Sequence, residues 1–163
     1  MSRLQSAFGL GDRLADRAQK ATPVALLLLR VCLAAVFIPS GWGKLHDLAK
    51  VTAFFTELGI PAPHLNAVVV AISELGCGTL LLLGLLARAA ALPLVASMAV
   101  AIITAKRADI AGVADLFALD EFLYVAMAFA VATLGPGRFA LDAAARRLAA
   151  GRAPSRSHSS ASV

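Results

Sequence analysis

The sequence is poor in charged residues. Asp, Glu, Lys and Arg make up 15% of its 163 residues, against about 25% in a typical soluble domain, and 60% of the residues are hydrophobic. The apolar residues gather in runs long enough to cross a hydrocarbon layer, which takes roughly 20 helical residues. The composition therefore excludes an ordinary soluble domain and indicates an integral membrane protein.

The common cofactor and catalytic motifs are also missing. The sequence has no Walker loop, no GxGxxG turn for a dinucleotide or flavin, no HExxH zinc motif and no serine nucleophile elbow. The apolar runs contain no histidine that could ligate a haem, and His46 and His64 are expected to be solvated. We expect no metal site, and the sequence does not decide whether the protein is an enzyme.

Four apolar segments predict an all-α fold, a four-transmembrane-helix bundle. Helices are favoured over strands because the runs lack two-residue alternation and a spanning segment must satisfy its own backbone hydrogen bonds. The segments cover residues 24–42, 65–87, 89–105 and 121–134. The last is short, since residues 122–134 would rise only about 20 Å, so we expect this span to begin nearer residues 115–120.

The connections predict one further helix and three regions of the chain. Residues 48–58 carry apolar side chains at helical spacing, which indicates a short amphipathic helix between the first and second spans. Residues 1–22 form an N-terminal segment, residues 23–142 the membrane domain, and residues 143–163 a basic, partly disordered tail.

The basic residues predict an orientation. With four spans, ten of the 15 lysines and arginines fall on one side of the membrane and four on the other. The remaining one, Arg30, lies inside the first span. Because such residues collect on the cytoplasmic side, we expect a multi-pass protein of the bacterial inner membrane with both termini cytoplasmic. The net charge of +5 then belongs to arginines that face anionic lipid, and no nucleic-acid partner is expected.

Two charged residues interrupt the apolar runs, Arg30 in the first and Glu74 in the second. A charge at bilayer depth is costly unless it is paired or faces a polar interior. An ion pair between them is geometrically possible if the first two spans are antiparallel neighbours. Two interpretations stay open: a structural pair that sets helix register, or a polar cavity where Glu74 exchanges a proton or binds a quinone oxygen or a cation. Lys44 either joins this intramembrane polar site or extends to the surface.

The two cysteines, Cys32 and Cys77, fall at similar depths of the first two predicted spans. They lack CxxC spacing, so small inert core residues are one interpretation and a redox-active pair is the other.

The chain resembles the DoxX family of small four-helix membrane proteins. The resemblance rests on LLRVCLAAVFIPSGWGKL with Arg30, FFTELGIPAP, ISELGCGTLLLLGLLAR with Glu74 and Arg88, and LGPGRFALD, in this order over roughly residues 24–142. It implies a likeness to subunits of quinol oxidases and of thiosulfate:quinone oxidoreductase, and association of some members with a sulfurtransferase and a superoxide dismutase.

Two classes of function follow. The first is a membrane subunit or anchor of a redox or oxidative-stress complex, which contacts quinone or docks a soluble oxidoreductase or sulfurtransferase. The second is a small transporter, permeation path or assembly factor without redox chemistry, in which the intramembrane charges line a passage.

Overall fold

The computed structural model describes residues 2–143, 145 and 147, with side chains from residue 19 onward. Within these residues every regular element is a helix, which confirms the all-α prediction. The elements in chain order are α1 (Ser2–His46), α2 (Leu48–Glu57), α3 (Pro63–Leu83), α4 (Ala87–Thr104), the 3-10 turn η1 (Arg107–Asp109), α5 (Val113–Ala118) and α6 (Asp120–Leu134). The predicted tail of residues 143–163 lies almost entirely outside the described residues.

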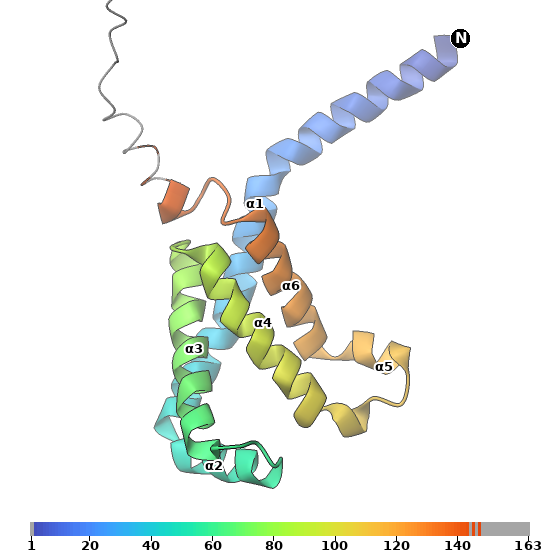
Figure 1. Ribbon diagram of the computed structural model, residues 1–163. Helices are drawn as coiled ribbons and strands as arrows, with labels where there is room; N and C mark the ends of the chain where they lie inside the picture. Colours follow the sequence, from blue (N-terminus) through green and yellow to red (C-terminus); the bar gives the residue numbers. More distant parts are fainter. Residues whose placement is uncertain (1, 144, 146, 148–163) are drawn as a thin grey trace, which may run out of the picture.

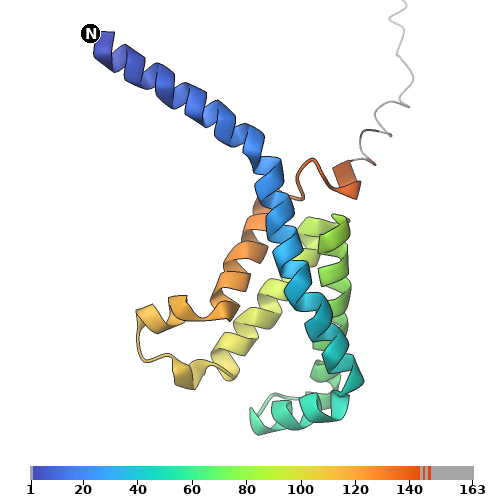
Figure 2. The same ribbon diagram turned by 180° about the vertical axis from the view of Figure 1, so that it is seen from behind.

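Three of the described helices are long and apolar enough to cross a membrane: Gln19–His46 within α1, Pro63–Leu83 and Ala87–Thr104. The fourth predicted span is α6, whose 15 residues rise about 22 Å. It begins at Asp120, within the predicted range of 115–120, because Leu119 has an extended backbone that separates α5 from α6. In Figures 1 and 2, α5 turns away from the axis of α6, which itself packs into the bundle.

Helices α1, α3, α4 and α6 form a ring of packed neighbours. The contacting pairs are α1 with α3, α3 with α4, α4 with α6 and α6 with α1, so α3 and α6 are diagonally placed. The N-terminal part of α1 projects away from the bundle, and α2 lies across the opposite end (Figure 1). Asp47 starts α2 by accepting a hydrogen bond from the Lys50 amide at 3.1 Å.

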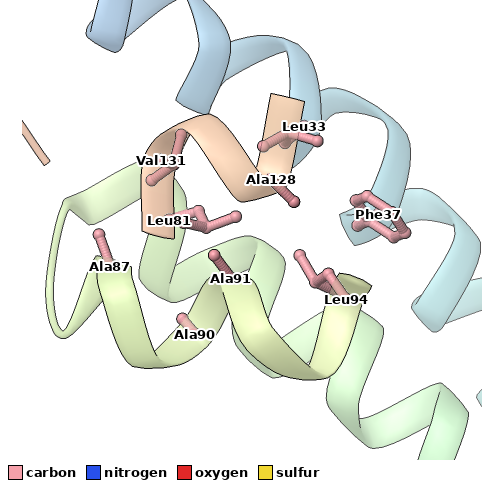
Figure 3. Close-up of a cluster of buried hydrophobic side chains, with 9 residues drawn as sticks. All are labelled: Leu33, Phe37, Leu81, Ala87, Ala90, Ala91, Leu94, Ala128 and Val131. Atoms are coloured by element: carbon pink, nitrogen blue, oxygen red, sulfur yellow. The ribbon is translucent and has the colours of Figure 1, made fainter. Parts of the chain in front are cut away.

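A layer of buried apolar side chains joins the four helices near the end where α3 and α4 meet. Figure 3 shows these residues, which are Leu33, Phe37, Leu81, Ala87, Ala90, Ala91, Leu94, Ala128 and Val131. Alanines on α4 and α6 let the helix backbones approach closely. Large apolar side chains elsewhere, such as Leu28, Ile72 and Phe129, are exposed, as expected for a surface that faces lipid.

Helices α1 and α3 touch backbone to backbone at Gly41. A β-carbon added there would lie 2.4 Å from the Leu75 amide nitrogen and 2.8 Å from the Ala71 carbonyl oxygen. Gly78 makes a second close approach, 3.1 Å from an Ile38 side-chain carbon by the same construction. The sequence of α1 thus fixes Ser40 and Lys44, which flank Gly41, directly beside α3.

Pro93 lies in the interior of α4, because this helix begins at Ala87. It supplies no amide hydrogen there, which leaves the Ala89 carbonyl without its usual helical donor.

Candidate functional site

Glu74 is held in a cluster of polar side chains between α1, α3 and α4. Its side chain is 1% exposed, and Lys44 forms an ion pair with its Oε2 atom. Ser40 donates a hydrogen bond to the same oxygen at 2.8 Å, and Lys44 donates one to Ser40 at 2.9 Å. Ser97 of α4 approaches Oε1 at 3.5 Å. The buried carboxylate is therefore neutralised and hydrogen-bonded, as a buried charge requires.

The predicted ion pair between Arg30 and Glu74 is not formed. Arg30, also 1% exposed, donates to four backbone carbonyls: Leu81 at 2.7 Å, Leu82 at 2.8 Å, Pro136 at 2.9 Å and Phe139 at 3.3 Å. The first two carbonyls belong to the last turn of α3, where helical carbonyls lack donors within the helix. Arg30 therefore joins α1 to the end of α3 and to the segment after α6.

Lys44 replaces Arg30 as the partner of Glu74 because of its place on α1. Ser40 and Lys44 are four residues apart and thus share one face of the helix. Their face meets α3 at the close contact of Gly41. Arg30 lies almost three helical turns before Ser40 on α1. It is on the other side of the buried layer that contains Leu33 and Phe37.

A cavity of about 760 Å³ opens beside this cluster. Its walls come from α1, α3, α4 and α6, and Phe54, Phe55 and Leu58 of α2 and its end close one side. Figure 1 shows α3 and α4 diverging from their hairpin toward the end where α2 lies. The volume falls within the range typical of small-molecule sites, which are mostly apolar with a few placed polar groups.

The polar groups of the cavity carry no net charge. Its lining contains Lys44 and Glu74, which pair, and Lys106 and Glu121, whose charged atoms lie 3.8 Å apart. Lys44 has three N–H donors, of which two are used. Tyr124 also lines the cavity, and its hydroxyl makes no hydrogen bond to the residues that the structure describes. Two donors from different helices are thus free to bind a ligand.

The sequence predictions missed Ser40, Ser97 and Tyr124. The four-residue spacing of Ser40 and Lys44 is the one signal that could have identified Ser40.

The two cysteines are free thiols. Cys32 is exposed on α1, and Cys77 is partly buried. Neither lines the cavity. Their interpretation as a redox-active pair stays a prediction.

Comparison with known proteins supports the family assignment. The DoxX family model matches residues 25–107, which is half of the chain. The chain belongs to the DoxX family. It is 32% identical over 132 residues to the "Uncharacterized membrane protein Rv3486" of Mycobacterium tuberculosis, covering 74% of this chain and 80% of that protein.

Two proteins of Escherichia coli are also similar. The chain is 29% identical over 127 residues to "Inner membrane protein YphA", covering 75% of this chain and 91% of that protein. It is 32% identical over 74 residues to "Inner membrane protein YqjF", covering 45% and 55% of the two chains. No solved structure matches the chain. This DoxX protein is therefore an integral membrane protein.

Proposed function

We propose that this DoxX protein binds the head of an uncharged lipophilic molecule, a quinone, as a membrane subunit or anchor of a redox or oxidative-stress complex. The observation that carries the proposal is the mainly apolar cavity of about 760 Å³ beside the Glu74–Lys44–Ser40 cluster. Because the charges of the lining cancel, the cavity favours a neutral head over a lipid phosphate or a free cation.

The free donors match the two carbonyl oxygens of a quinone ring. Lys44 on α1 and Tyr124 on α6 each have a donor that no described residue uses, and both line the cavity. A ring seated between them accepts one hydrogen bond at each carbonyl, and its apolar tail leaves along Val69, Val100 and neighbouring apolar side chains. Glu74 holds the Lys44 ammonium in place.

The redox assignment rests on the family resemblance, which also supports docking of a soluble oxidoreductase or sulfurtransferase on the membrane subunit. We assign the protein to the bacterial inner membrane because its two Escherichia coli relatives are named inner membrane proteins. The chain enters and leaves the helix bundle on the same side (Figures 1 and 2). This arrangement supports two cytoplasmic termini. Reporter fusions at each end test this orientation, and reporters active in different compartments would contradict it.

A permeation path or transporter is less well supported. A path needs polar lining toward both ends of the bundle, whereas the polar residues of the cavity lie only on the α2 side of the buried layer. Beyond that layer Arg30 is fully engaged with backbone carbonyls. The cavity is therefore better suited to hold a ligand than to pass one.

The proposal is tested by purifying the protein in mild detergent and measuring bound quinone by solvent extraction and mass spectrometry. We expect near-stoichiometric quinone in the unaltered protein. Tyr124→Phe removes one ligand hydrogen bond, worth about 0.5–1.5 kcal/mol, and should weaken binding about 2- to 12-fold without affecting folding, because the hydroxyl has no described protein partner.

The matched control is Thr79→Val, which removes a hydroxyl on α3 that bonds only to its own helix, at the Leu75 carbonyl. Thr79 is exposed and does not line the cavity. Quinone binding should be unchanged in this variant. Absence of quinone from every preparation, even after added quinone, or equal binding by the Tyr124 and Thr79 variants, would reject the proposal.

A further inference from the structure

A second, smaller recess lies at the other end of the bundle. It has a volume of about 330 Å³ and is lined by Arg88, Leu134, Pro136, Gly137 and Ala143. These residues come from the start of α4, the end of α6 and the segment that follows. The recess is separated from the large cavity by the buried layer of Figure 3, and the proposed quinone site does not use it.

Arg88 is a cation without a partner in the described part of the chain. No carboxylate of the described residues lies within 4.0 Å of its guanidinium, the limit for an ion pair. The guanidinium also donates no hydrogen bond to these residues. It packs over Gly135, where an added β-carbon would lie 3.0 Å from Arg88 Nε and 3.1 Å from one terminal nitrogen. Arg30, by contrast, has carbonyl acceptors for each of its nitrogens.

The charge around the recess is positive. Arg138 lies one residue beyond Gly137 and is exposed. After Glu121 the only acidic residue in the sequence is Asp142, whose amide donates to the Gly84 carbonyl at 3.2 Å. An anion that enters the recess therefore meets an unpaired guanidinium and few opposing charges.

Apolar side chains stand beside the guanidinium. Leu86 is 66% exposed and Leu134 is 64% exposed, and both lie at helix ends. A ligand that satisfies both features has a phosphate for Arg88 and an acyl chain for the leucines. A guanidinium suits a phosphate because its planar fork can donate two parallel hydrogen bonds.

We propose that the Arg88 recess is a binding site for the headgroup phosphate of an anionic phospholipid. The lipid packs its acyl chain against Leu86 and Leu134. It thus occupies the recess between the start of α4 and the end of α6. The site tethers these two helix ends to the lipid surface at the basic end of the bundle.

Native mass spectrometry of delipidated full-length protein, titrated with phosphatidylglycerol or phosphatidylcholine, tests the proposal. We expect one phosphatidylglycerol to be retained in preference to phosphatidylcholine. Arg88→Gln should lower this retention about 10-fold. Arg88→Lys, which keeps the charge but loses the planar fork, should give a smaller loss. Because Arg88 is exposed, none of these variants should lower the melting temperature.

The matched control is Arg138→Gln, which removes the same charge at the same end but does not line the recess. We expect less than a twofold effect on lipid retention. Equal losses in the two variants would mean diffuse attraction and would overturn the proposal, as would retention that is independent of Arg88. Displacement of the lipid by millimolar inorganic phosphate at constant ionic strength would assign the recess to free phosphate instead.

Discussion

At the scale of single residues, the cost of burying Glu74 is offset by specific partners. A carboxylate in a low-dielectric interior is destabilising unless an opposite charge and hydrogen-bond donors compensate it. Lys44 supplies the charge, and Ser40 supplies a donor at 2.8 Å. The pair is asymmetric, because the Glu74 side chain is 1% exposed whereas that of Lys44 is 26% exposed.

This asymmetry predicts unequal effects of breaking the pair. Lys44→Met strands a buried carboxylate and should destabilise the protein by about 3–5 kcal/mol. Glu74→Gln should cost less, because Lys44 can extend its ammonium toward the surface. The double variant should be more stable than the sum of the two losses implies, by about 1–3 kcal/mol. Unfolding in mixed detergent micelles provides the measurement.

Lys50→Met serves as the control for this cycle, since Lys50 is an exposed lysine of α2 that lies outside the cavity. It should change stability by less than about 0.5 kcal/mol. Strictly additive effects of Lys44→Met and Glu74→Gln would show that the two side chains do not interact.

At the scale of helices, the contact of α1 with α3 positions the site. Gly41 allows the two backbones to meet, and without that approach Ser40 and Lys44 would stand farther from Glu74. Small residues have this role in membrane proteins generally, because packing and hydrogen bonding drive helix association in lipid.

Gly41→Ala should therefore separate α1 from α3 and destabilise the bundle by about 1–3 kcal/mol. Gly43→Ala, two residues farther along α1, is the matched control, because an added β-carbon there meets no atom within 4 Å. It should be neutral or stabilising by up to about 1 kcal/mol. Thermal unfolding in detergent checks both, and equal stabilities of the two variants would contradict the close contact.

The end of α3 depends on a second glycine. Gly84 ends the helix with φ = 71°, and an added β-carbon would lie 2.5 Å from an Arg30 terminal nitrogen and 2.6 Å from the Ala140 β-carbon. Gly59 has nearly the same φ, 70°, but no atom within 4 Å of such a carbon. The two positions thus share a backbone cost and differ in packing.

Alanine at both positions separates these two costs. Gly59→Ala should destabilise by the left-handed backbone penalty alone, about 1–2 kcal/mol. Gly84→Ala should lose more, because it also displaces Arg30 from the Leu82 carbonyl. Chemical denaturation of the two variants measures the difference, and a larger loss at Gly59 would refute the role of Arg30 as a clamp on the end of α3.

At the scale of the whole molecule, hydrophobic patterning predicted the four helices of the bundle, the α2 connection and the interior position of Arg30 and Glu74, but not η1 or α5. It did not predict their partners, because distance along a helix gives depth but not the direction in which a side chain points. A long lysine at the edge of a span can reach inward as well as outward, and Arg30 found acceptors at a helix end. The cavity itself depends on how α3 and α4 diverge, which no local pattern encodes.

The proposed function depends on this cavity as the place where a neutral lipophile binds. Photolabelling with a photoreactive short-chain quinone, followed by peptide mapping, tests it most directly. We predict adducts in the α3 segment 69–74 and the α4 segment 93–101, lost in excess unlabelled quinone and reduced in Tyr124→Phe. Adducts confined to lipid-facing residues such as Leu28 and Phe129, or to the Arg88 recess, and insensitive to competition, would contradict it.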